Sequence, residues 1–185
     1  NNFLKFGLIA FISTILLYKS KLFLPDAGLY HLPFIKIINS EKIIFGLSNL
    51  HFRFGHASIL QYINATNNNF IQNEIGVIFP ISILVSTFVI FLFFEVKKIT
   101  YLKDRSYQYL LILILFFSIT FLERYSDYGN DAAGFIYSIL CIIYFFKIQN
   151  LNSEDDIKKF NLLILFSVFA FLNKTFLILF LILPL

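Results

Sequence analysis

The sequence predicts an all-α integral membrane protein with about six transmembrane helices, the last of them truncated. Two observations support this prediction. Hydrophobic residues make up 58% of the 185 residues and charged residues only 14%, whereas soluble domains average about 25% charged residues. The apolar residues are also gathered in long runs that short polar breaks separate. Such a chain is typical of proteins that are embedded in a lipid bilayer.

The apolar runs define the expected spans in order. A transmembrane helix needs about 20 predominantly apolar residues, and fewer where flanking side chains reach the interface. The runs that meet this requirement are about 3–18, 76–95, 108–123, 131–147, 160–173 and 175 to the end. The last two are so close together that they form either a tight hairpin or one bent helix. Residues 1–185 are therefore expected to be a single transmembrane domain, the N-terminal part of a larger protein.

Residues 19–74 are predicted to form the first outer loop, with amphipathic helices. Between His31 and Phe45, apolar residues alternate with Lys, Asn and Glu, as in a helix that lies in the plane of the membrane interface. A second short helix is expected from about His56 to Ile63, after a turn region from Gly46 to Gly55. A polar loop at 64–69 would then lead back to the bilayer.

The distribution of Lys and Arg predicts the orientation of these spans. Both residues are denser in segments 96–107 and 147–159 than in the other breaks. Because Lys and Arg favour the cytoplasmic side, these two segments are expected inside the cell. We therefore predict a multi-pass protein of the bacterial inner (cytoplasmic) membrane that contacts membrane lipids. The net charge of +4 is spread out rather than gathered in a block, which argues against a nucleic-acid partner.

Ionisable residues lie in the breaks between the apolar runs. An ionisable group at the mouth of a span is costly unless it has a function or a partner. The residues of this kind are Asp26, Asp127, Asp131 and Lys174. If their breaks face the same side of the membrane, they form one acidic site.

Two motifs and the topology resemble the multi-spanning C-type glycosyltransferases. The motifs are 26–31 (DAGLYH) and 46–53 (GLSNLHFR), and they are similar to a poorly characterised bacterial branch of that superfamily. In the superfamily, an essential acidic residue follows the first span, interfacial helices come next, and a second acidic motif lies in the next outer loop. The matching residues here are Asp26 in the first loop and Asp127 or Asp131 in the second. The first motif has one acid where many relatives have an adjacent pair.

The resemblance implies that a sugar moves from a polyprenyl-phosphate donor to an acceptor on the non-cytoplasmic face, in cell-envelope glycan or glycolipid assembly. This hexosyltransferase chemistry needs a base for the proton of the acceptor hydroxyl and positive charge for the departing phosphate. Asp26 is the expected base. The expected substrate-binding residues are Tyr30, His31, His51, Arg53, Asp127, Asp131 and Lys174.

No cofactor is required by the spacing of these residues. Carboxylate oxygens are nevertheless the ligands that hard divalent cations prefer. The set that would hold Mg²⁺ or Mn²⁺ is Asp26, Asp127 and Asp131.

Structural explanations stay open for the same residues. Asp26 follows Pro25 and is well placed to start a turn or cap a helix. Asp131 is well placed as the N-cap of the helix that follows it, and Lys174 could extend its ammonium group to a membrane surface.

Two other classes of protein also remain. A lipid or polysaccharide transporter or flippase would show broken spans and internal pseudo-symmetry, and a non-catalytic assembly subunit would need no acidic site.

Overall fold

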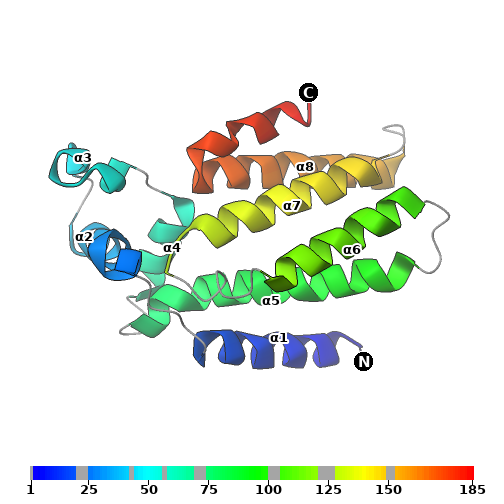
Figure 1. Ribbon diagram of the computed structural model, residues 1–185, viewed down its shortest axis with the longest axis horizontal. Coiled ribbons are helices and arrows are strands. Elements are labelled where there is room, and N and C mark those ends of the chain that lie inside the picture. The colour runs from blue at the N-terminus through cyan, green and yellow to red at the C-terminus, as the bar shows by residue number, and fades with distance from the viewer. Residues whose placement is uncertain are drawn as a thin grey trace.

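The long helices of the protein extend along one axis. The computed structural model describes residues 2–19, 25–41, 44–55, 58–68, 74–99, 105–120, 128–148 and 153–185. The long helices in these ranges are α1 (Asn2–Lys19), α5 (Glu74–Ile99), α6 (Arg105–Thr120), α7 (Asp131–Lys147) and α8 (Glu154–Asn173). Figure 1 shows them stacked side by side, with α1 and α5 below and α7 and α8 above.

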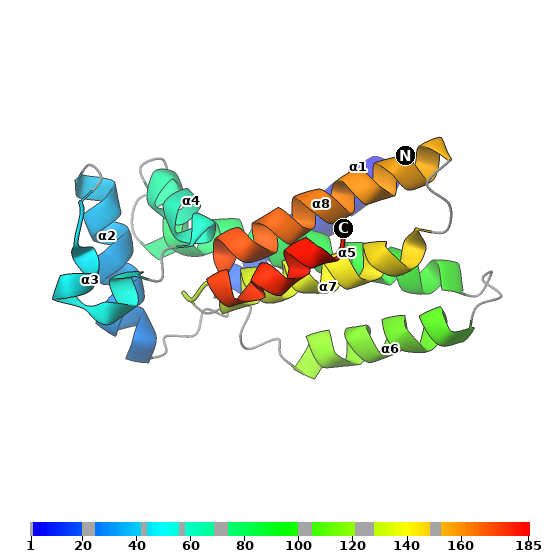
Figure 2. The same ribbon diagram turned by 90° about the horizontal axis from the view of Figure 1, so that it is seen from above.

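The short helices gather at one end of the long ones, as Figures 1 and 2 both show. They are η1 (Ala27–His31), α2 (Leu32–Ser40), α3 (Leu47–Leu50), η2 (Phe52–Gly55) and α4 (Ile59–Asn68). At the C-terminal end of the chain, η4 (Thr175–Ile182) folds back beside α8 and α7. The turn between α8 and η4 therefore lies at the same end of the molecule as the short helices.

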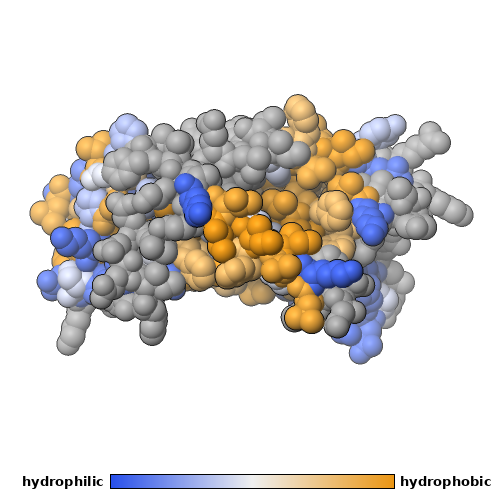
Figure 3. Space-filling view, turned by 90° about the horizontal axis from the view of Figure 1, so that it is seen from below, coloured by the Kyte–Doolittle hydropathy of each residue, from blue (hydrophilic) through white to orange (hydrophobic). Residues whose placement is uncertain are grey.

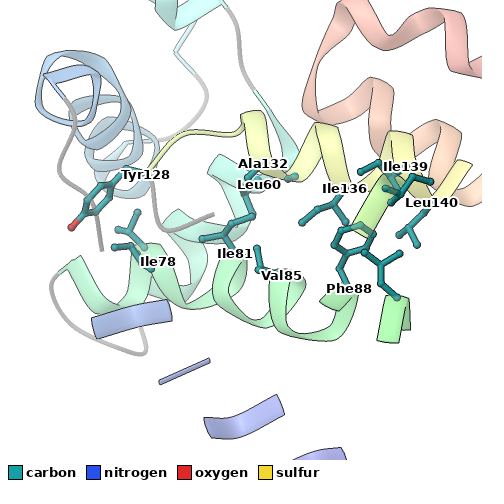
Figure 4. Close-up of a cluster of buried hydrophobic side chains, with 14 of the residues drawn as sticks. Leu60, Ile78, Ile81, Val85, Phe88, Tyr128, Ala132, Ile136, Ile139 and Leu140 are labelled. Atoms are coloured by element: carbon teal, nitrogen blue, oxygen red, sulfur yellow. The ribbon is translucent and has the colours of Figure 1, made fainter. Parts of the chain in front are cut away.

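Helix α5 supplies the centre of the hydrophobic core. Its fully or nearly buried side chains recur every three to four residues, which places them on one helix face. They are Ile78, Ile81, Val85, Phe88 and Leu92. This face meets Leu60 of α4 and Ile136 of α7 (Figure 4). The core therefore joins the short helices to the long ones.

The prediction of about six transmembrane helices in a multi-pass inner-membrane protein is wrong. Among the described residues, only Gly76–Lys97, with a mean hydropathy of 2.7, is both long and apolar enough to cross a membrane. The apolar helices Gly7–Leu16 and Tyr107–Ser118 are shorter than a span requires. One such helix is weak evidence for membrane insertion, because the core helix of a globular protein has the same character.

Two of the expected spans differ from the structure for visible reasons. Residues 147–159 were expected as a loop, but α8 already begins at Glu154, where Ser153 Oγ accepts a hydrogen bond from the Asp156 backbone N–H at 3.1 Å. Acidic residues in the first turn of α8 further favour a helix start there. The run from 175 onward forms the eight-residue 3₁₀ helix η4 rather than a new span.

The charges that set the predicted orientation belong largely to helices. Lys97 lies within α5, Arg105 is the first residue of α6, and Lys147 is the last residue of α7. The Lys147 ammonium is 2.5 Å from a carboxylate oxygen of the buried Glu95. The cytoplasmic assignment of their segments no longer has a basis, because the expected spans that it depended on are not supported.

The expected first loop contains more helical turns than the sequence indicated. Helix α2 ends at Ser40, whereas the amphipathic pattern was extended to Phe45. Helix α4 continues to Asn68, so the predicted polar loop at 64–69 is wrong, and Asn64 is buried in this helix. The expected turn region contains α3 and η2, and it starts at Gly46, whose φ of 82° suits glycine.

Much of the apolar surface of the long helices is exposed. Leu8 and Phe11 of α1 and Leu113 and Phe116 of α6 are all at least 60% exposed. Figure 3 shows apolar residues across the middle of the lower face, with hydrophilic residues toward both ends. Extended apolar areas of this kind mark surfaces that bind proteins, membranes or ligands.

Candidate active site

A polar cavity of about 290 Å³ lies where the short helices meet the start of α7 and the end of α8. Residues from five segments of the chain line this cavity. Those that the sequence singled out are Asp26, Tyr30, His31, Arg53, Asp131 and Lys174. The structure therefore brings six of the eight expected site residues together.

Asp26, Tyr30 and Arg53 form a connected group on one wall. The Tyr30 hydroxyl donates a hydrogen bond to Asp26 Oδ2 at 2.9 Å and accepts one from Arg53 Nη1 at 3.4 Å. The Arg53 guanidinium also lies over the Tyr30 ring, 5.0 Å from its centroid. Asp26 makes no side-chain capping hydrogen bond. Its carboxylate is therefore directed to Tyr30 rather than to a helix end.

The protonation of Tyr30 follows from this arrangement. Burial, together with the hydrogen bond and negative charge of Asp26, raises the pKa of Tyr30 to about 12, although Arg53 acts in the opposite direction. The phenol is therefore protonated at neutral pH. Tyr30 can donate a hydrogen bond in the cavity, but it is not the group that takes a proton.

Lys174 and Asp131 form an ion pair that also lines the cavity. Asp131 is the first residue of α7 and Asn130 is the N-cap, so the expectation that Asp131 caps this helix is wrong by one residue. Lys174 lies between α8 and η4, where the backbone is extended, and its ammonium is 5.5 Å from the centre of the Phe176 ring. The pair joins the turn after α8 to the start of α7.

Gly134 allows the segment around Lys174 to lie directly on α7. A Cβ atom at this position would be 3.2 Å from Leu177 Cδ1 and 3.4 Å from Lys174 Cγ. The contact with Leu177 is tighter than side chains usually make, so Leu177 would have to shift by a few tenths of an ångström, whereas the contact with Lys174 is close to an ordinary one. The small residue on α7 therefore helps to place the ammonium of Lys174 at the cavity.

A buried polar network forms the floor of the cavity. His31, Gln61 and Asn173 are each at most 6% exposed and all line it. Sequence reasoning missed Gln61, Asn130 and Asn173. The pattern Ser58-x-x-Gln61 is a helix-start signature and could have drawn attention to Gln61. The two asparagines carry no comparable signal, because their partners are distant in the sequence.

His51 is placed behind this site rather than in its lining. Its ring stacks on Tyr30 at a centroid distance of 6.1 Å, and its Nδ1 accepts a hydrogen bond from the Arg53 backbone N–H at 3.2 Å. It therefore supports Tyr30 and Arg53. Asp127, the other expected residue, lies outside the described residues.

The residues expected to hold a metal come together only in part. Asp26 and Asp131 both line the cavity. Within the described ranges, no group of three or more His, Cys, Asp or Glu side chains could hold a metal ion. A metal site of the expected composition would depend on Asp127, whose position is not described.

An apolar groove adjoins the polar cavity. Its volume is about 560 Å³, and it shares Asp131, Lys174 and Phe176 with the cavity. Most of its remaining lining is apolar and comes from α7 and η4: Ala132, Phe135, Ile139, Ile142, Leu177 and Phe180. The two spaces meet around these shared residues, so together they suit a ligand with a polar head and an apolar chain.

Comparison with known proteins identifies the family. Residues 1–185 match the domain of unknown function (DUF8201), and the chain belongs to this family. No curated protein and no solved structure was found to be similar to it.

Proposed function

We propose that this chain is a glycosyltransferase that moves a sugar from a polyprenyl-phosphate donor to an acceptor hydroxyl. One observation carries the proposal. A cavity that contains two carboxylates and two basic side chains, Arg53 and Lys174, adjoins an apolar groove, and Lys174 lines both spaces. A lipid-linked sugar phosphate has the same order of apolar chain, anionic group and polar sugar.

The side chains of the cavity match the needs of the transfer reaction. Asp26 takes the proton of the acceptor hydroxyl while the acceptor oxygen forms a bond to the anomeric carbon of the sugar. The bond between that carbon and the phosphate oxygen breaks, and polyprenyl phosphate leaves with the electron pair. Lys174 and Arg53 stabilise its negative charge, Arg53 through its planar guanidinium.

The groove provides the site for the hydrocarbon chain of the donor. Phe135 and Ile139 of α7 face the same space as Leu177 and Phe180 of η4. Each methylene group that leaves water for such a surface contributes about 0.8 kcal/mol. The groove therefore supplies affinity, while the polar cavity supplies the chemistry.

Two other functions make different demands on the same residues. A lipid transporter would use the groove and the basic side chains but would not need a base at Asp26. An assembly subunit would need neither the groove with its basic side chains nor a base at Asp26. No membrane side is assigned to the transfer, because the prediction of that side depended on the multi-span topology.

Turnover of a defined donor tests the proposal. The full chain in mixed lipid–detergent micelles would be given radiolabelled polyprenyl-phosphate mannose or glucose, with an octyl glycoside as acceptor. We expect transfer to fall about 10²-fold in Asp26→Asn, the scale of general base catalysis. The matched control is Glu41→Gln, an exposed acid at the end of α2. If the wild type binds the donor but does not transfer the sugar, the glycosyltransferase proposal is overturned. If Asp26→Asn transfers the sugar at the wild-type rate, Asp26 is not the base.

A further inference from the structure

Hydrogen bonds beneath the cavity connect His31 to the start of α4. We propose that Gln61 is a positioning residue that holds His31 as a neutral imidazole with its proton on Nε2. In this form the ring can donate a hydrogen bond only through Nε2. The use of that donor by a sugar rests on the proposed function, whereas the protonation of the ring does not.

The orientation of the Gln61 amide is set by a backbone group. The Ser58 backbone N–H is 3.1 Å from Gln61 Oε1. A backbone N–H can only donate, so the atom that faces it must be the carbonyl oxygen of the side chain. The NH₂ group of Gln61 must therefore lie on the other side.

That NH₂ group faces His31. Gln61 Nε2 is 3.4 Å from His31 Nδ1. Because the NH₂ group can only donate, Nδ1 must accept and therefore carries no proton. The single proton of the neutral ring is then on Nε2. A doubly protonated ring would place two donors against each other in a buried position.

Further hydrogen bonds hold Gln61 and Ser58 in place. The Ser58 hydroxyl donates to Asn173 Oδ1 at 3.4 Å. Asn173 Nδ2 in turn donates to the Phe169 carbonyl at 2.8 Å, and Asn130 Nδ2 donates to the Asn173 carbonyl at 3.2 Å. The network thus ties the orientation of Gln61 to the start of α7 and the end of α8.

Charged side chains of both signs line the cavity beside His31. The titratable groups that line the same space are Asp26 and Tyr30 near His31 in the chain, Arg53 from η2, Asp131 from α7 and Lys174 after α8. The NH₂ group of Gln61 is the described contact that acts on Nδ1 itself.

A simpler role for Gln61 is to cap α4. Its side chain reaches back to the backbone N–H of Ser58, the residue before α4, as in a capping box. Glutamate performs the same capping, but its carboxylate can only accept where Gln61 donates to His31. Gln61→Glu therefore separates the two roles.

Long-range ¹H–¹⁵N correlation spectra of the ¹⁵N-labelled full chain measure the protonation of each imidazole. His31→Gln and His51→Gln assign the signals of the three histidines. In the wild type we expect His31 to carry its proton on Nε2. In Gln61→Glu we expect a proton on Nδ1 and a pKa of His31 higher by about one unit or more. His51, whose Nδ1 accepts from Arg53 N–H, should keep its form in both proteins.

The spectrum of the wild type and the spectrum of Gln61→Glu can each overturn the proposal. A wild-type His31 with its proton on Nδ1 would contradict it, and this result needs no folded variant. An unchanged His31 in Gln61→Glu, at a wild-type melting temperature, would leave Gln61 as a helix cap only. The spectra are recorded without any sugar. If they agree with the expectation but the transfer assay shows no activity, only the proposed function is rejected.

Discussion

Tyr30 is the residue around which the cavity is arranged. Its hydroxyl joins the carboxylate of Asp26 to the guanidinium of Arg53, and its ring stacks on His51. Tyr30 was expected from the motif 26–31 to bind substrate, but the motif did not predict that its hydroxyl bridges Asp26 and Arg53. The bridge depends on Arg53, which is 23 residues further along the chain.

At pH 10 we expect Tyr30 to remain protonated, because its pKa is raised to about 12. The difference in phenolate absorbance between the wild type and Tyr30→Phe should then be close to zero at this pH. N-acetyltyrosinamide, half ionised near pH 10, is the reference. Since the folded pKa lies above the unfolded value, the stability from the bound proton is complete below pH 10 and is lost as the pH rises through about 12. A half-ionised phenolate signal at pH 10 would refute this description.

The ammonium of Lys174 should contribute directly to the affinity for the phosphate group. Lys174→Met is expected to weaken polyprenyl-phosphate binding about tenfold, since a charge-assisted hydrogen bond contributes about 1.5–3 kcal/mol. Asp131→Asn should keep or raise the affinity because it frees the ammonium, and it should cost about 1 kcal/mol of stability or less. Titration calorimetry with polyprenyl phosphate measures both, and the exposed Lys36→Met is the control. Equal affinities for all four proteins would remove Lys174 from the phosphate site.

At the scale of helices, apolar periodicity locates elements better than it assigns their role. The predicted run 131–147 has the bounds of α7, but the same kind of run after Thr175 became the short helix η4. The run length did not reveal that Ser153 and the acids after it start α8. If residues 153–156 (SEDD) are interpreted as a helix start, the sequence predicts a helix from Glu154 instead of a loop up to 159.

Two glycine positions offer a matched test of how closely η4 packs on α7. Alanine is favoured over glycine inside a helix by about 1 kcal/mol. Gly7→Ala in α1 should show a gain of this kind, because a Cβ there meets nothing within 4 Å. Gly134→Ala should show a smaller gain or a loss, since Leu177 must shift to admit the new Cβ. Denaturant unfolding measures the two changes, and equal gains would contradict the close packing.

At the scale of the whole molecule, a buried ion pair ties α5 to α7 at the end of α7 away from the cavity. Glu95 is 5% exposed, and the Lys147 ammonium bonded to it also lies over the rings of Phe91 and Tyr144. The sequence suggested only a cytoplasmic loop charge at Lys147. Its partner is 52 positions earlier in the numbered chain, so no local pattern could reveal the pair.

Removal of one member of this pair should be costly. Lys147→Met leaves the Glu95 carboxylate buried without its cation, and we expect a loss of about 3 kcal/mol in the free energy of unfolding. The double variant Glu95→Leu with Lys147→Leu should lose less than the sum of its single changes. Lys158→Met, an exposed lysine of α8, provides the control with little change. Additive losses in the double variant would show that the two groups do not interact.

The candidate site was more accessible to sequence reasoning than the fold around it. Chemically distinctive residues such as Asp26, Arg53 and Lys174 stand out in apolar surroundings, and the structure gathers them in one cavity. The residues that were missed are buried amides with distant partners, such as Asn173, which bonds Ser58 115 positions away. Composition could not distinguish membrane spans from the exposed apolar faces of shorter helices.

Photo-crosslinking with a polyprenyl phosphate that carries a diazirine in its chain tests the central claim most directly. If the groove between α7 and η4 holds the lipid and Lys174 holds its phosphate, mass spectrometry should find the label on Ile139, Leu177 or Phe180. The yield should fall about tenfold in Lys174→Met, following the loss of phosphate affinity. Label spread over the exposed apolar residues of α1 and α6, at a yield that Lys174→Met does not change, would contradict the lipid-phosphate site.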